Sequence, residues 1–202
     1  ISETPEHQIK DFRKNFQMLF QDVYSSLDPK MKVLEIVTEP LAIHSIGTQK
    51  ERFNKACELI TKVGLSPDDL QKYPHQFSGG QRQRIGITRA LCSQPKFIVC
   101  DEPVSALDVS VQAQILNLLL DLRKDFNLSY LFIAHDLGVV KYFSDRIIVM
   151  YLGKIVEVAL AKDIYASPKH PYTEALLAAI SKYKVGSERK ILLQGSIPDP
   201  SN

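Results

Sequence analysis

The segment FSGGQRQR, residues 77–84, places a hydroxyl side chain and two glycines at the start of a predicted helix. Ser78 is a good N-cap, and Gln81 stands three residues later, which is the spacing of a capping box. Free backbone N–H groups at a helix start attract anions, and Gly79 and Gly80 would let an anion approach the backbone closely. The pattern indicates half of a phosphate clamp, and it also fits a glycine turn before an ordinary core helix.

Composition and charge narrow the class of protein. Of the 202 residues, 45% are hydrophobic, which is enough for a sizeable core. The formal net charge of +2 gives no reason to expect nucleic acid or an anionic membrane as a partner. The three cysteines lack the paired spacing of a metal site or a disulfide framework. Because no apolar run approaches the roughly 18 residues of a membrane span, we expect no direct membrane span and a cytoplasmic chain.

Two adjacent carboxylates follow a continuous apolar run. The run at residues 96–100 predicts a strand covered on both faces, and it ends in Asp101 and Glu102. The C-terminal ends of strands are where open α/β sheets bind their ligands. Asp101 can hold Mg²⁺ there while Glu102 deprotonates a water, but the same pair also suits the cap of a turn.

Two other predicted strands also end in polar residues. Residues 16–20 suggest a short buried strand followed by Gln21, and residues 130–134 form a strand followed by His135. Gln21 fits a metal or water ligand, or a hydrogen-bonded loop residue. His135 fits a group that contacts a γ-phosphate or holds the attacking water, or an N-terminal residue of the next helix.

Helical periodicity fills much of the remaining chain. Residues 22–29 are rich in turn formers and predict a loop, and residues 33–70 predict a small helical insert. Ser110 is expected to cap a helix, and residues 146–157 read as a strand, a turn and an edge strand. This alternation predicts an α/β fold with a mainly parallel sheet covered by helices.

The two ends of the chain read differently. Residues 6–14 have helical character, and from about Asp163 the sequence changes to a proline-containing segment followed by a helix at residues 175–180. The polar tail beyond Lys184 predicts no fixed structure.

Taken in order, five elements resemble the conserved motifs of ABC-type ATPases. They are the Q-loop at Gln21, the signature at 77–81, Walker B at 97–102, the D-loop at 105–108 and the H-switch at His135. The resemblance implies a partial P-loop NTPase-like α/β core with a helical subdomain insert and a short C-terminal appendage. It therefore also implies ATP and Mg²⁺ as ligands.

A narrower resemblance points to peptide transport. Residues 20–27, residues 77–91 and His170-Pro171-Tyr172 look like the ATP-binding subunits of oligopeptide and dipeptide permeases, nearest the F-type subunit. The last segment distinguishes these subunits from ABC ATPases of DNA repair or translation. The implied function is ATP hydrolysis coupled to peptide import, at the inner face of the cell membrane.

The resemblance also divides the chain into four parts. Residues 1–32 are the Q-loop end of a truncated ATPase core, and residues 33–92 are the helical signature subdomain. Residues 93–160 carry Walker B, the D-loop and the H-switch, and residues 161–202 are the permease-type extension.

The implied roles at the chain's own nucleotide follow from the matching positions. Asp101 and Gln21 would bind Mg²⁺, with Gln21 also sensing the water. Glu102 would be the general base, and His135 would contact the γ-phosphate.

Other implied roles require partners. Ser78, Gly79, Gly80 and Gln81 would bind the ATP held by a second ABC ATPase subunit, the same or homologous. Asp108 would communicate across that dimer. Residues 22–47 would bear on the cytoplasmic loops of membrane-embedded permease subunits.

The sequence departs from the family in one respect. No G-x-x-x-x-G-K-[ST] segment occurs in it, so it looks like the C-terminal two-thirds of a longer polypeptide. We expect the 202-residue chain alone to be inactive. Two alternatives remain: an ABC ATPase that does not serve transport, and a non-catalytic interaction fragment.

Overall fold

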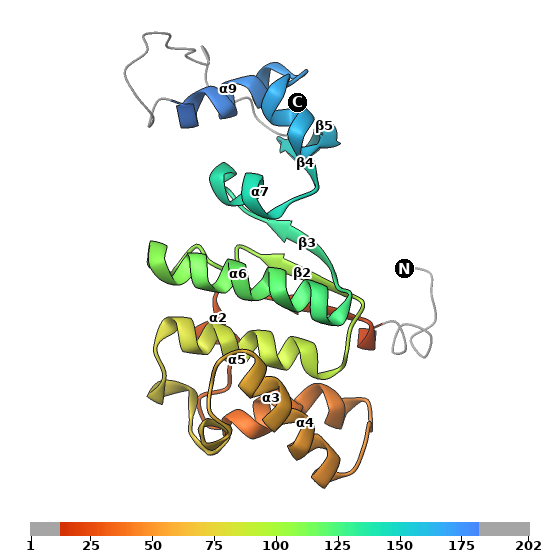
Figure 1. Ribbon diagram of the computed structural model, residues 1–202, viewed down its shortest axis with the longest axis vertical. Coiled ribbons are helices and arrows are strands. Elements are labelled where there is room, and N and C mark those ends of the chain that lie inside the picture. Colours follow the sequence, from red (N-terminus) through yellow and green to blue (C-terminus); the bar gives the residue numbers. More distant parts are fainter. Residues whose placement is uncertain (1–12, 182–202) are drawn as a thin grey trace. The chain divides into compact units, whose positions relative to one another are not determined.

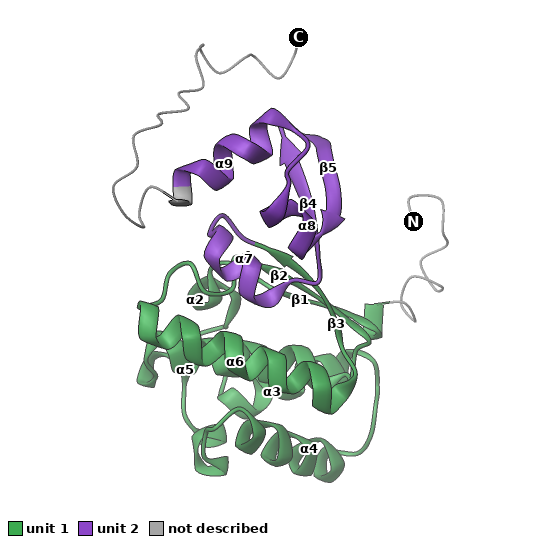
Figure 2. Cartoon of the chain, turned by 45° about the horizontal axis from the view of Figure 1, so that its top comes forward, with its two compact units in different colours: residues 1–133 green, residues 134–202 purple. Residues whose placement is uncertain are grey.

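The computed structural model describes residues 13–181 (Figure 1). The chain forms two compact units. Unit 1 comprises residues 1–133, and unit 2 comprises residues 134–202 (Figure 2). Most of the helical segment predicted at 6–14 and the whole tail beyond Lys184 lie outside the described residues.

Unit 1 contains a three-stranded parallel sheet in which the middle strand is the second along the chain. The strands, in their order across the sheet, are β1 (Phe16–Leu19), β2 (Phe97–Asp101) and β3 (Ser129–Ile133). In the register, Leu19 stands beside Cys100, and Cys100 stands beside Phe132. Because all three strands run in the same direction, the residues that follow them gather at one edge of the sheet.

The sheet has one covered and one open face. Helix α6 (Val109–Phe126) packs on the covered face, where the Tyr130 hydroxyl donates to the Leu119 carbonyl at 3.2 Å. On the other face Phe16, Leu131 and Ile133 are 47%, 42% and 44% exposed. The prediction of a buried first strand is therefore wrong for Phe16. The predicted covering of the sheet by helices applies to only one face of β1 and β3.

A helical insert separates β1 from β2, as predicted. Its elements pack around buried aliphatic side chains. They are α3 (Val33–Ile43), α4 (Gln49–Lys62), the 3-10 turns η1 (Pro67–Gln71) and η2 (Pro74–Gln76), and α5 (Gly79–Cys92). Helix α4 begins with a capping box between Thr48 and Glu51 and ends before Gly64, whose φ of 79° requires a residue without a Cβ.

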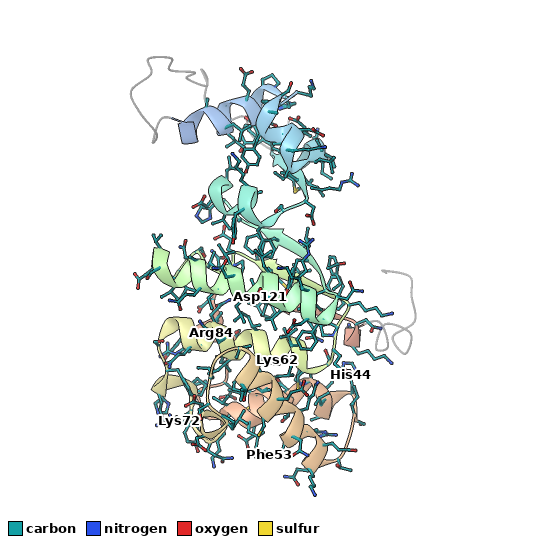
Figure 3. The ribbon with its side chains drawn as sticks, viewed as in Figure 1. His44, Phe53, Lys62, Lys72, Arg84 and Asp121 are labelled. Atoms are coloured by element: carbon teal, nitrogen blue, oxygen red, sulfur yellow. The ribbon has the colours of Figure 1, made fainter. Side chains whose placement is uncertain are left out.

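Two cationic side chains hold the insert to α6. Lys62, at the end of α4, lies 3.3 Å from the Asp125 carboxylate. Arg84 of α5 donates to the Val63 carbonyl and, at 3.3 Å, to Gln114 of α6. Figure 3 labels both Lys62 and Arg84 between these helices. These contacts therefore connect α4 and α5 to α6.

The structure corrects two predictions, one about a loop and one about the start of a helix. The segment predicted as a loop at 22–29 contains α2 (Val23–Ser26), and the Asp22 carboxylate caps it by accepting the Ser25 N–H at 3.2 Å. Helix α6 begins at Val109 with Asp108, not Ser110, in the N-cap position. Asp and Ser serve turns and helix caps equally well, so composition alone does not separate the two.

Unit 2 is built on an antiparallel hairpin. Its elements are α7 (Leu137–Phe143), β4 (Arg146–Tyr151), β5 (Lys154–Leu160), α8 (Ala161–Ala166) and α9 (Pro171–Ser181). Leu152 and Gly153 form the turn with φ values of 47° and 75°, which match the twist of a tight hairpin. The predicted strand, turn and strand at 146–157 are confirmed. Val140, Ile147, Val149 and Ile164 form the core.

A carboxylate on β5 holds the segment that leads into α9. Glu157 accepts the backbone N–H groups of Lys169 at 2.8 Å and His170 at 3.0 Å. The nearby Thr173 hydroxyl, followed by these two N–H groups, holds the pKa of Glu157 below its ordinary value. We call this arrangement the Glu157 clasp. It attaches the start of α9, which lies within the predicted C-terminal extension, to the hairpin.

Within residues 13–181, every helix is too short or too polar to cross a bilayer.

Candidate active site

Gln21 and Glu102 meet at the edge where the parallel strands end. Gln21 follows β1 closely, and Glu102 directly follows β2, which pairs with β1. The Gln21 side-chain amide Nε2 donates to Glu102 Oε2 at 2.8 Å, although 81 positions separate the two residues. The structure therefore brings two of the three predicted catalytic residues into direct contact.

The backbone of Glu102 is held in an unusual conformation. Its φ is 44°, in the left-handed region that residues other than glycine seldom occupy. Its N–H donates to the Ile133 carbonyl at 3.0 Å, and its carbonyl accepts the N–H and the hydroxyl of Ser105 at 3.2 and 3.1 Å. These bonds fix the direction of the Glu102 side chain, because the surrounding turn determines its backbone.

Asp101 is the last residue of β2 and is half-buried. In the parallel register it stands beside Ile133, so it belongs to the open face of the sheet. No group of three or more His, Cys, Asp or Glu side chains between residues 13 and 181 is arranged to hold a metal ion. Magnesium needs fewer protein ligands, because it commonly uses one or two carboxylates and completes its shell with water and phosphate. The side-chain oxygens of Asp101 and Gln21 are therefore of the type that Mg²⁺ binds.

The N-terminus of α5 has the predicted capping box. The Ser78 Oγ accepts the Gln81 N–H at 3.3 Å, and Gln81 Oε1 accepts the Ser78 N–H at 2.9 Å. Ser78 and Gly79 are exposed, and the first backbone N–H groups of a helix have no carbonyl partner within it. The helix start is therefore open to an anion supplied from outside the chain.

The signature segment lies beside the start of α6. Figure 1 shows α5 and α6 side by side, and a Cβ placed on Gly79 would lie 3.4 Å from Leu107 Cδ2. Asp108 is exposed, and its carbonyl accepts the Gln112 N–H at 2.8 Å. The predicted signature and D-loop residues are thus neighbours within unit 1.

His135 stands two residues after β3 and belongs to unit 2. The next residue, Asp136, caps α7 by accepting the N–H groups of Gly138 at 2.7 Å and Val139 at 3.3 Å. His135 is exposed and precedes this cap, so it is not part of the helix.

Sequence reasoning missed the contacts that join α2 to α5. Arg89 of α5 donates to the Ser26 carbonyl at 2.7 Å, and burial lowers the pKa of its guanidinium, which stays charged. Arg82 lies over the Tyr24 ring, with 4.8 Å between the guanidinium carbon and the ring centroid. Together these contacts attach the segment after Gln21 to the signature helix.

The spacing of three residues on α5 could have indicated that another segment packs against this helix. Arg82, Gly86 and Arg89 recur at four and three positions, which places them on one helix face. A Cβ on Gly86 would lie 3.5 Å from Val23 Cγ1, so a small residue here lets α2 approach closely. The segment across from that face could not be identified without the fold.

A groove of about 870 Å³ lies between the N-terminal halves of α3 and α4. None of the predicted catalytic or nucleotide-binding residues lines it. Its lining includes Leu34, Glu35, Thr38, Lys50, Arg52 and Phe53, the last of which Figure 3 labels. It is therefore separate from the Gln21 and Glu102 contact.

Two family models match the chain. The model described as ABC transporter matches residues 1–105. The chain belongs to the ABC transporter family. A second model, described as the C-terminal region of oligopeptide/dipeptide transporters, matches residues 156–202. The resemblance to ABC ATPases of the peptide-permease type is thereby confirmed.

Curated relatives of this ABC chain are also similar along nearly its whole length. The oligopeptide transport ATP-binding protein AppF of Bacillus subtilis is 50% identical over 206 residues, covering 100% of this chain and 63% of the relative. OppF of the same organism is 56% identical over 174 residues, covering 86% and 57%. A putative peptide import ATP-binding protein of Brucella ovis is 54% identical over 192 residues, covering 94% and 60%. The chain spans about three-fifths of the length of these relatives.

A solved structure supports the predicted fold class. The ATP-binding cassette MJ0796, a dimer in a post-hydrolysis state bound to ADP and Pi, matches with a TM-score of 0.67 and 29% identity. The match covers 79% of this chain and 68% of that one. The α/β, P-loop NTPase-like class is confirmed, whereas the roles of individual site residues and the four-part division stay predictions.

Proposed function

We propose that the intact polypeptide containing this chain is the ATP-binding subunit of an importer of oligopeptides or dipeptides. The match of residues 156–202 to the C-terminal region of peptide transporters carries the proposal, because that region lies outside the ATPase core. The same match, together with His170-Pro171-Tyr172, disfavours an ABC ATPase that does not serve transport.

The proposed reaction is hydrolysis of the β–γ phosphoanhydride bond of ATP. Glu102 takes a proton from a water, whose oxygen attacks the γ-phosphorus while the bond to the β-phosphate oxygen breaks, giving ADP and phosphate. Asp101 and Gln21 would hold Mg²⁺, which would neutralise charge on the β- and γ-phosphates. His135 contacts the γ-phosphate. The hydrogen bond from Gln21 to Glu102 supports this assignment, because it brings the Gln21 amide and the Glu102 carboxylate together at the end of the parallel strands.

The α5 N-terminus serves a nucleotide held by the partner subunit. Gly79 and Gly80 present their backbone N–H groups to its γ-phosphate, Ser78 presents its hydroxyl, and Gln81 presents its side-chain amide. Asp108, next to them on α6, contacts the same partner. The exposure of Ser78, Gly79 and Asp108 supports this role, since none of them is covered within unit 1.

The helical insert faces the permease subunits, with the protein peripheral on the cytoplasmic side of the membrane. Residues 22–47 form the docking region, and the groove between α3 and α4 lies within and beside it. The attachment of α2 to α5 through Arg89 supports coupling, because movement of residues 22–27 would displace the signature helix.

The test uses the full-length polypeptide with its permease subunits in lipid vesicles. Glu102→Gln should still bind ATP but hydrolyse it at least about 10²-fold more slowly, because the general base is lost while the metal ligand remains. Peptide uptake should fall in parallel. Unchanged hydrolysis would remove Glu102 from catalysis, and hydrolysis without any peptide uptake would exclude the importer.

A further inference from the structure

The two glycines of the signature segment have different surroundings inside the chain. A Cβ on Gly80 would lie 2.6 Å from Val111 Cγ1, a separation that real Cβ atoms essentially never show. A Cβ on Gly79 would meet its nearest neighbour, Leu107 Cδ2, at 3.4 Å, which is ordinary contact. Only Gly80 is therefore required by packing within unit 1.

Val111 has little freedom to move away. It is β-branched and lies in the first turn of α6, where such side chains keep essentially one rotamer. Gln112, the next residue, fixes that turn, because its N–H donates to the Asp108 carbonyl at 2.8 Å and its Nε2 donates to the Leu107 carbonyl at 2.9 Å. Displacing Val111 would therefore displace the start of α6 together with Asp108.

The start of α6 is in turn fixed relative to Glu102. Ser105 donates to the Glu102 carbonyl through both its N–H and its hydroxyl, and the Leu107 N–H donates to the Val104 carbonyl at 3.2 Å. These turns leave little slack between the end of β2 and α6. A shift at Val111 is thereby transmitted to the backbone of Glu102.

A second chain of contacts connects Glu102 to α5. Glu102 accepts the Gln21 amide, α2 follows Gln21, and Arg89 ties the end of α2 to α5, the helix that begins at Gly79. The contact of Gly80 with Val111 then connects α5 back to α6, so the contacts form a closed cycle.

We propose that Val111 is a positioning residue whose contact with Gly80 sets the spacing between the signature N-terminus of α5 and the loop from Glu102 to Asp108. The proposal rests on the proposed function, in which this spacing aligns the clamp on the partner's nucleotide. It explains the glycine at position 80 by packing within the chain. The competing explanation is that a phosphate of the partner's nucleotide needs the space, and the two make opposite predictions for a compensating change at Val111.

The experiment is a double-mutant cycle in the full-length polypeptide, measuring the unfolding midpoint, kcat and KM for ATP. Gly80→Ala should lower the midpoint by about 4 °C or more because it overpacks the contact, and should lower kcat about tenfold with little change in KM. Val111→Ala alone should also lower kcat, because the spacing is no longer held. In Gly80→Ala with Val111→Ala the nearest Val111 atom is Cβ at 3.9 Å, so both the midpoint and kcat should recover.

Two control variants make the cycle specific. Val111→Thr keeps the branched shape and should not rescue Gly80→Ala, whereas Gly79→Ala should leave the unfolding midpoint within about 1 °C of the wild type. A double variant whose midpoint recovers while kcat stays as low as in Gly80→Ala would overturn the proposal in favour of the phosphate. An unchanged midpoint in Gly80→Ala, or an unchanged kcat in Val111→Ala, would also overturn it. If the wild type hydrolysed no ATP, the proposed function would fail, and the midpoints would still decide the contact.

Discussion

Gln21 occupies one of the two carboxylate oxygens of Glu102, donating its amide to Oε2 at 2.8 Å. A carboxylate oxygen accepts up to two hydrogen bonds, so a water that delivers its proton to Oε2 has to bind beside this amide. The position of Gln21 thus determines how a water can approach Glu102, the proposed general base. Because α2 follows Gln21 directly and contacts α5, this control extends to the signature helix.

Exchanging the Gln21 amide for a carboxylate should change the pH dependence of hydrolysis. In Gln21→Glu of the full-length polypeptide, a second negative group beside Glu102 favours protonation of one of the pair. We expect the acid limb of the kcat profile to move to higher pH when hydrolysis is measured between about pH 5 and 9. Gln21→Leu is the control: it removes the hydrogen bond to Glu102 without adding a charge, so it should lower kcat and move that limb less than Gln21→Glu does. An unmoved limb in Gln21→Glu would show that the two side chains separate before the reaction.

Removing the Arg89 guanidinium should destabilise unit 1. Arg89→Met leaves the Ser26 carbonyl without its charged donor, which typically costs about 2 kcal/mol. For a chain of this size that corresponds to a fall of roughly 4–8 °C in the unfolding midpoint, measurable by circular dichroism. Lys124→Met, an exposed change on α6, should shift the midpoint by less than about 2 °C. Equal shifts in the two variants would contradict the role assigned to Arg89.

The Glu157 clasp should open on acidification. The folded state lowers the pKa of Glu157, so its contribution to stability is fully present above the unfolded-state pKa of about 4.3 and is lost as the pH falls through the lower folded-state pKa. Hydrogen exchange of the peptide covering 161–181, corrected for intrinsic rates, should therefore accelerate below about pH 4. Glu157→Ala should show the fast exchange already at neutral pH, whereas Glu174→Ala, an exposed change on α9, should not.

The 202-residue chain alone should neither bind Mg-ATP tightly nor hydrolyse it. A P-loop backbone and its lysine supply most of the positive potential around the β- and γ-phosphates, and no such sequence occurs in residues 1–202. Asp101 and Glu102 add negative charge, and an exposed helix start contributes only about 0.3–1 kcal/mol to anion binding. Isothermal titration with Mg-ATP tests this prediction. A saturable site of micromolar affinity in this chain would contradict it.

The parallel core was predictable because its strands are short apolar runs ending in polar residues. The runs before Asp101 and His135 became β2 and β3 with boundaries shifted by about one residue. Gln21 and Glu102 were predicted separately, and only strand pairing places them in contact. Local sequence patterns report neighbours along the chain, whereas a parallel pair joins residues across a long insertion.

The features that the sequence did not predict depend on what packs against a residue. Gly79 and Gly80 look alike in the sequence, and their difference arises from Leu107 and Val111 on another helix. The open face of the sheet was missed for the same reason, since an apolar strand residue such as Leu131 is expected to be covered.

The pairing of β1 with β2 sets an order of events during synthesis. Phe16 pairs with Phe97, so β1 leaves the ribosome well before its neighbour exists. At roughly 5–20 residues per second, the intervening insert takes on the order of ten seconds to translate. During that interval the insert can assemble from contacts close in sequence, which form early. The nascent chain therefore carries Phe16 and its strand without their β2 partner until the helices that separate them have been made.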